Sequence, residues 1–173
     1  MFNKSLLVTL LLSSLLQAKD NFSSERFLGI EAGYGEIQSR NIIGVPKSSK
    51  GVEFGMRFGA QNKEWRTTLS AHHFNKNGQQ YFRTMLAFDH FVWSSLYKTD
   101  DIIFKPYFGL HIGWLTYTDP ATDDNGFIYG GQAGLAWNVM REVDFDFGYR
   151  YSLSNVNKVD NIGSVVFAVN YLY

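Results

Sequence analysis

Apolar and polar side chains alternate at every second position along most of the chain after Phe27, in eight segments separated by polar, turn-prone stretches. The segment 104–115 is the clearest, because Phe108, Leu110 and Ile112 alternate there with smaller or more polar residues. Successive side chains of a β-strand point to opposite faces, so each apolar set must lie on one face of a sheet. The pattern predicts strands over about 28–35, 52–59, 65–72, 81–89, 104–115, 127–138, 143–152 and 164–173, each near the length that a tilted strand needs to cross a membrane.

The two faces differ in the size of their side chains. One face carries mostly Phe, Trp, Tyr and Leu, whereas the other carries Gly, Ala, Ser and charged groups. The interior of an eight-stranded barrel has room only for modest side chains, so we expect the bulky face to meet lipid and the small, charged face to line the lumen. A secreted soluble barrel of the lipocalin kind, with its apolar face inside, is the alternative.

The expected inner face carries a balanced set of charges, which predicts an internal ion-pair network rather than an open pore. We expect Arg66 and Arg83 to lie near the rims, in water. The acids are Glu31, Glu53, Asp89, Asp144 and Asp146, and the bases are Arg57, Arg66, Arg83, Lys105 and Arg150.

The connections and the strand ends fit a membrane barrel as well. Outer-membrane barrels have short periplasmic turns, longer outer loops and aromatic girdles at both interfaces. We expect short connections at 60–64, 97–101 and 138–142, long ones at 38–50, 117–125 and 153–161, and an intermediate one at 75–80. The expected girdles are Phe27, Trp65, Phe104 and Trp137 at one end and Tyr34, Trp114, Tyr149 and Tyr151 at the other.

The first residues read as an export signal. Lys4 precedes the uncharged run Leu6–Leu16, and Ala18 offers a small residue for cleavage. An uncleaved anchor is the alternative, but the run is much shorter than the roughly 20 residues of a spanning helix. We therefore expect residues 1–18 to be a signal peptide and residues 19–173 to be one barrel domain.

Composition adds exclusions. The chain has no cysteine, which excludes disulfides and thiolate metal sites, and its 16 basic and 16 acidic residues give no charge bias toward nucleic acid. A mean hydropathy of −0.17 argues against a bundle of membrane helices.

Two segments carry a family resemblance. The run 105–113 (KPYFGLHIG) resembles the PYxGxGxG-type strand of small outer-membrane β-barrel proteins, with His111 where a small residue is common. The run 127–151 looks like the next hairpin of that family and ends in its GYRY strand. The alternation of Val165–Tyr173 is similar to the signal that the barrel-assembly machinery reads, although a terminal Phe is more typical than Tyr173. The resemblance implies the class that includes opacity-type adhesins and the OmpA transmembrane domain, which shares architecture more than activity.

Catalytic and metal motifs are weak. Lipid A deacylases carry His-x-Ser-Asn near late strand ends, whereas the segment Arg150–Asn155 offers no histidine to activate a serine. His72 and His73 are adjacent and should point to opposite faces, and His90 and His111 lie in other strands. The acidic run Asp119–Gly126 lacks the spacing of a calcium loop, and Lys47–Lys50 is an unspecific polar segment, so we expect both to be solvated loops. Weak binding of a divalent cation is the alternative for the first segment, and a contact with lipopolysaccharide phosphates or a host molecule is the alternative for the second.

Taken together, these features predict a monomeric, eight-stranded, antiparallel up-and-down transmembrane β-barrel in the bacterial outer membrane. We expect a structural or surface-contact, adhesin-like role through the outer loops, with no catalytic residue, cofactor or metal. The expected partners are outer-membrane lipids and lipopolysaccharide, and the barrel-assembly machinery through the C-terminal strand, with no nucleic acid. A narrow channel for ions or small solutes and a lipid A-modifying enzyme are the alternatives.

Overall fold

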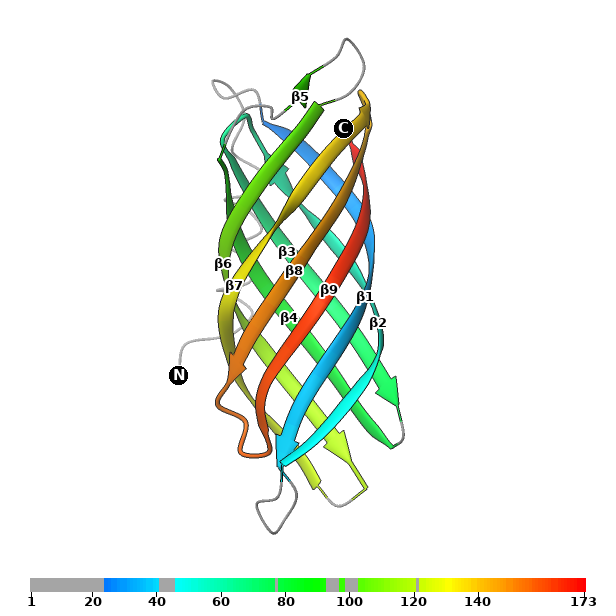
Figure 1. The fold of residues 1–173 in the computed structure, drawn as a ribbon, viewed down its shortest axis with the longest axis vertical. Coiled ribbons are helices and arrows are strands. Elements are labelled where there is room, and N and C mark those ends of the chain that lie inside the picture. The colour runs from blue at the N-terminus through cyan, green and yellow to red at the C-terminus, as the bar shows by residue number, and fades with distance from the viewer. Residues whose placement is uncertain (1–23, 41–45, 77, 93–96, 99–102, 121) are drawn as a thin grey trace, which may run out of the picture.

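The computed structural model describes residues 24–40, 46–76, 78–92, 97–98, 103–120 and 122–173. In this part of the chain, eight long antiparallel strands form a closed barrel, with the strands steeply tilted around its axis (Figure 1). They are β1 (Glu25–Arg40), β2 (Pro46–Gln61), β3 (Trp65–Lys76), β4 (Gln79–Phe91), β6 (Ile103–Asp119), β7 (Thr122–Met140), β8 (Val143–Ser154) and β9 (Val159–Leu172). The two-residue strand β5 (Tyr97–Lys98) pairs only with the start of β6.

Each long strand pairs with its neighbours in the chain, and β1 pairs with β9 to close the barrel. The main chains of Arg26 and Tyr173 exchange two hydrogen bonds at that seam, of 3.2 and 2.9 Å. We call the end of the barrel that carries Arg26 and Tyr173 the terminal end. The opposite end, where β1–β2, β3–β4, β6–β7 and β8–β9 are joined, is the outer end. The predicted fold class and all eight predicted strands are therefore confirmed.

The connections differ from the prediction in two places. The segments expected as long outer loops are mostly paired strand, since the β1–β2 ladder continues to Arg40 and Pro46 and the β6–β7 ladder to Asp119 and Thr122. Polar residues above the membrane still satisfy their backbone groups best by pairing, so polarity alone does not end a strand. The expected short turn around 97–101 is instead a longer connection that contains β5, because β4 ends at Phe91 and β6 begins at Ile103.

Short turns occur at the positions where local chemistry favours them. The β2–β3 turn is held by Asn62, whose side-chain oxygen accepts hydrogen bonds of 2.8 Å from the backbone N–H groups of Glu64 and Trp65. In the β3–β4 turn, Gly78 has a φ of 76°, a conformation that favours glycine.

The burial pattern is inverted relative to a soluble protein. Leu110, Ile30 and Phe54 face outward and are 74%, 66% and 66% exposed, whereas Glu53 and Asp89 face the lumen and are fully buried. A continuous apolar exterior of this extent requires lipid rather than water around it. This inversion excludes the alternative of a soluble barrel with an apolar interior. No helix in the described residues is long and apolar enough to cross a membrane.

Aromatic side chains gather at both ends of the apolar exterior, as expected, except that the prediction for Phe27 is wrong. Phe27 is 1% exposed and faces the lumen, where the guanidinium of Arg57 lies 5.5 Å from its ring centroid. At the terminal end, Trp65 packs on His90 with ring centroids 4.4 Å apart, and Phe104 stacks on Trp137 at 5.3 Å. At the other end of the apolar band, Tyr34, Trp114, Tyr149 and Tyr151 are all outward-facing and exposed.

Candidate functional site: the barrel lumen

Nine of the ten charged residues predicted to face the lumen are buried there. The tenth, Lys105, is half-buried, with its ammonium group 5.5 Å from the ring centroid of Phe91. The expectation that Arg66 and Arg83 lie in water at the rims is wrong, because their exposures are 1% and 0%. A long arginine side chain that starts near a strand end reaches inward, and the guanidinium of Arg66 lies over the ring of Tyr107 at 4.3 Å.

Seven of the buried side chains form a closed ring of hydrogen bonds and ion pairs across the lumen. Six of them are charged residues of the predicted set, with one each on β1, β2, β3 and β4 and two on β8. The seventh is a glutamine on β7, which takes part through its side-chain amide. In order around the ring they are Glu31, Arg57, Asp146, Arg66, Asp89, Gln132 and Arg150.

Glu31 is the most connected acid of the ring. Its carboxylate accepts hydrogen bonds from both terminal nitrogens of Arg150, at 2.7 and 3.2 Å, and from Arg57 at 3.3 Å. His72 Nε2 lies 2.7 Å from the same carboxylate. The Glu31 carboxylate thus compensates the buried positive charges of Arg57 and Arg150.

Asp146 and Asp89 hold the other side of the ring. Asp146 accepts from Arg57 at 3.3 Å, from Arg66, and from the Tyr107 hydroxyl at 2.6 Å. Asp89 accepts from Arg66 Nε at 2.9 Å and from the Gln132 amide at 2.6 Å. Through Tyr107 on β6, the network touches every long strand except β9.

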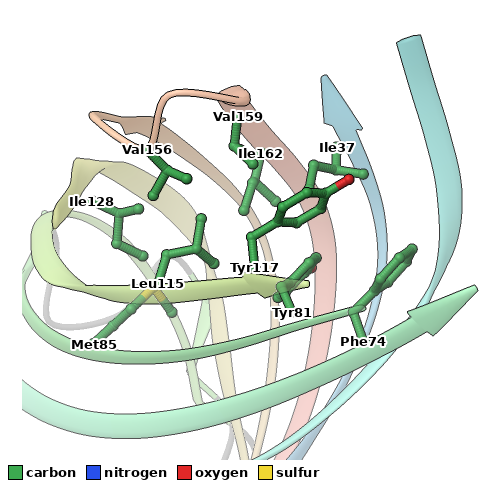
Figure 2. Packing of buried hydrophobic residues seen from close by; sticks show 10 residues of the cluster. All are labelled: Ile37, Phe74, Tyr81, Met85, Leu115, Tyr117, Ile128, Val156, Val159 and Ile162. Carbon is green, nitrogen blue, oxygen red and sulfur yellow. The ribbon is translucent and has the colours of Figure 1, made fainter. Parts of the chain in front are cut away.

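A second ion pair and an apolar cluster lie between the ring and the outer end. Arg83 donates to both carboxylate oxygens of Glu53, at 2.7 and 2.8 Å, and the Tyr81 hydroxyl donates to the same group at 2.6 Å. Beyond them, buried apolar side chains from opposite walls meet across the lumen (Figure 2). We call this cluster the apolar plug; it consists of Ile37, Phe74, Tyr81, Met85, Leu115, Tyr117, Ile128, Val156, Val159 and Ile162.

The alternation of the strands does not by itself predict the apolar plug, although the sequence contains a signal for it. Inward positions along the strands are small or charged in the middle of the barrel, but Ile37, Leu115 and Ile162 occupy inward positions toward the outer end. This local change in the inward pattern marks the outer end of the lumen as apolar.

The histidines lie on different faces of the barrel wall. His72 faces the lumen and His73 faces outward, as their adjacency predicts. The expectation that no histidine is available to the Arg150–Asn155 segment is wrong, because His111 Nε2 lies 2.8 Å from Ser152 Oγ. Both side chains are buried in the lumen, and His111 Nδ1 has no hydrogen-bond partner among the described residues, so no acid orients the ring.

Other candidates from the sequence make contacts within the protein. Asp124 Oδ2 accepts a hydrogen bond of 3.1 Å from the backbone N–H of Asn157, which ties the start of β7 to the β8–β9 turn. Lys50 pairs with Glu36 at 3.2 Å on the outer wall. No group of three or more His, Asp or Glu side chains placed to hold a metal ion occurs in the described part of the chain.

A closed eight-stranded barrel with an apolar exterior, aromatic girdles and a charged interior defines the class of small bacterial outer-membrane β-barrel proteins. No protein-family model matches the chain, and no curated protein matches it in sequence. Solved structures of other proteins show the same fold. Neisserial surface protein A has 18% identity and a TM-score of 0.68, with 86% of this chain and 97% of that chain covered.

Two structures from Pseudomonas aeruginosa are similar at a lower level. The N-terminal β-barrel domain of OprF is 11% identical with a TM-score of 0.53, over 87% of this chain and 100% of that chain. The outer membrane protein OprG is 15% identical with a TM-score of 0.53, over 87% and 98%. At sequence identities this low, the similarities show the fold of this chain alone.

Proposed function

We propose that this chain is a closed, non-conducting outer-membrane barrel that acts through its outer surface, as a structural or surface-contact protein without catalysis. The observation that supports this proposal is the filled lumen, in which the charged ring and the apolar plug lie in series. An ion would have to displace charge-compensated side chains at the first and lose its hydration at the second. In bilayers, the purified refolded protein should give no steady current, and a steady current that scales with salt would overturn the proposal.

A narrow channel is the second candidate function, and a specific observation favours it. Several buried side-chain atoms in the lumen have no hydrogen-bond partner in the described residues, including Arg83 Nε and Nη1 and His111 Nδ1. Such groups are usually satisfied by internal water. The same bilayer recording separates the two functions, because isolated waters carry no current and a continuous water file carries one.

The surface-contact role can be tested on whole cells. The outer end presents charged side chains, among them the exposed Lys76 and Asp123. Cells that express the wild type should adhere to immobilised polyanionic glycans more than cells without the protein, and Lys76→Gln, which removes an exposed cation, should reduce that adhesion. Equal adhesion of all three strains would contradict a contact role on these surfaces.

The absence of catalysis is part of the proposal. Ser152 and His111 face the filled lumen rather than lipid, so an acyl substrate has no route to the serine. Mass spectra of lipid A from cells with and without the protein should be identical, and a change in acylation would refute this part.

We also propose a monomer that is exported by cleavage after residue 18 and assembled through its last strand. The signal segment 1–18 lies outside the described residues. N-terminal sequencing of the mature protein should begin at Lys19, and deletion of Tyr173 should lower the amount of folded barrel in the membrane.

A further inference from the structure

A groove with a volume of about 270 Å³ lies on the outside of the barrel wall, toward the outer end of β8, β9, β1 and β2. Its floor is at Gly163, which sits opposite Tyr151 on one side and Glu36 on the other. Both neighbours face outward, so Gly163 is an outward position without a side chain. The groove is therefore a gap in the apolar exterior and does not lead into the lumen.

The lower part of the groove is aromatic and apolar. Tyr149, Tyr151 and Val165 stand beside Gly163 and are 52%, 41% and 44% exposed, and Tyr34 closes the opposite side. Tyrosines at this height belong to the interfacial girdle, where the ring meets acyl chains and the hydroxyl meets headgroups. A slot of this kind fits a hydrocarbon chain lying along the wall.

The upper part of the groove is polar. The ammonium group of Lys50 lies 3.2 Å from Glu36, and the Lys50 side chain is 57% exposed. An ammonium group has three donors, so Lys50 can bind an anion while Glu36 holds it above the slot. Beside it, the Asn161 amide donates to the Gln38 side chain at 3.0 Å, and both amides keep further donors and acceptors for hydroxyl groups.

We propose that this groove binds one phosphorylated glycolipid of the outer leaflet, with an acyl chain over Gly163 and a phosphate on Lys50. The apolar slot matches the chain, the cation matches the phosphate, and the paired amides match the sugar hydroxyls. The site goes beyond the proposed function, which concerns the lumen and the outer turns. It also differs from general lipid contact, because a cation and a pair of amides lie directly above the apolar slot.

Native mass spectrometry of the full-length mature protein tests the site. The refolded wild type, released from detergent in the presence of purified bisphosphorylated lipid A, should retain one lipid per chain. Enzymatically dephosphorylated lipid A and phosphatidylglycerol should be retained about tenfold less. Equal retention of all three lipids, or none of lipid A, would overturn the proposal, as would a lipid-free dimer, which would make the groove a contact between copies.

Gly163→Leu fills the slot without reaching the lumen. A Cβ atom at this position would lie 2.6 Å from the hydroxyl of Tyr149, which is the far end of a flexible side chain and can move. Gly131→Leu is the matched control, since Gly131 is an outward glycine on β7 whose nearest neighbour to an added Cβ is a carbonyl oxygen at 3.4 Å. Heat-modifiable gel mobility confirms that both variants fold.

The variants should separate the two halves of the site. Gly163→Leu should lower lipid A retention about tenfold, and Gly131→Leu should leave it unchanged. Lys50→Gln should remove the preference for phosphorylated over dephosphorylated lipid A while keeping the slot. Wild-type retention in folded Gly163→Leu would overturn the proposed slot, and an unchanged phosphate preference in Lys50→Gln would overturn the role of the cation.

Discussion

Replacing Glu31 with glutamine should strongly destabilise the barrel, because the substitution removes a buried charge and leaves the volume unchanged. In the wild type, the carboxylate compensates Arg150 through two hydrogen bonds and Arg57 through one. After the substitution, Arg57 keeps Asp146, but Arg150 keeps only the neutral Gln132 as its ring partner. Breaking a buried ion pair on one side costs ~3–5 kcal/mol, so the free energy of unfolding should fall by about that amount.

Glu36→Gln is the matched control for this experiment. Glu36 lies on the same strand but on the outer wall, where its side chain is 37% exposed and pairs with the exposed Lys50. Exposed ion pairs contribute little to stability, so Glu36→Gln should unfold at the same urea concentration as the wild type. Urea unfolding in lipid vesicles, followed by tryptophan fluorescence, gives the midpoint and slope for each variant.

The outcome of the comparison is decisive for the charged ring. Equal midpoints for Glu31→Gln and Glu36→Gln would refute the reasoning, because a solvated Glu31 would then behave like a surface residue. The double variant Glu31→Gln, Arg150→Gln should recover part of the lost stability, since removing both partners leaves no unpaired charge. If the double variant loses more unfolding free energy than the two single variants lose together, a direct pair between Glu31 and Arg150 is contradicted.

Three further predictions concern the exterior, the plug and the wall of the barrel. Ile30→Arg, at an outward position, should cost ~2–4 kcal/mol in vesicle unfolding, whereas a cost near zero would contradict a lipid-facing exterior. Leu115→Ala should cost ~2–5 kcal/mol in the same assay because it hollows the apolar plug, and Leu110→Ala on the same strand, which faces lipid, should cost less; the reverse order would refute the plug. Gly55→Val should abolish the heat-modifiable folded band, because an added Cβ would lie 2.7 Å from the backbone oxygen of Ala71. A folded Gly55→Val band would show that the β2–β3 wall can move apart.

The sequence predicts the strands and their faces well because both are local consequences of the chain. Alternation with period two directs each side chain, and residue size then distinguishes lipid from lumen. The alternation assigns nine buried charges to the interior correctly and places Lys105 near them. The size difference between the two faces is therefore enough to distinguish an inverted barrel from a soluble one.

What the sequence does not contain is the register between strands that are distant in the chain. Glu31 and Arg150 are 119 positions apart and meet only because β1, β9 and β8 are staggered as they are. The same holds for His111 and Ser152, which lie on β6 and β8 and meet over Gly130 of the intervening strand β7. The pairing of the ring, and the reach of Arg66 from a strand end to the centre, follow from that stagger.

The extent of the strands also depends on pairing rather than on local preference. Segments such as Asp119–Gly126 are polar enough for loops, yet their backbone groups pair in the β6–β7 ladder up to the Pro120 turn. Hydropathy marks the apolar band of a strand, whereas its length is set by how far the neighbouring backbone continues.

Cysteine accessibility tests the central claim, a membrane barrel with a closed lumen, in one measurement. The chain has no native cysteine, so Ser70→Cys reports the lumen, where Ser70 is 4% exposed, and Ile30→Cys reports the apolar exterior. In lipid vesicles, a water-soluble maleimide should label neither variant until urea unfolds the barrel, and a lipid-soluble maleimide should label only Ile30→Cys. Labelling of folded Ser70→Cys by the water-soluble reagent would show an open lumen, and such labelling of folded Ile30→Cys would contradict a lipid-facing exterior.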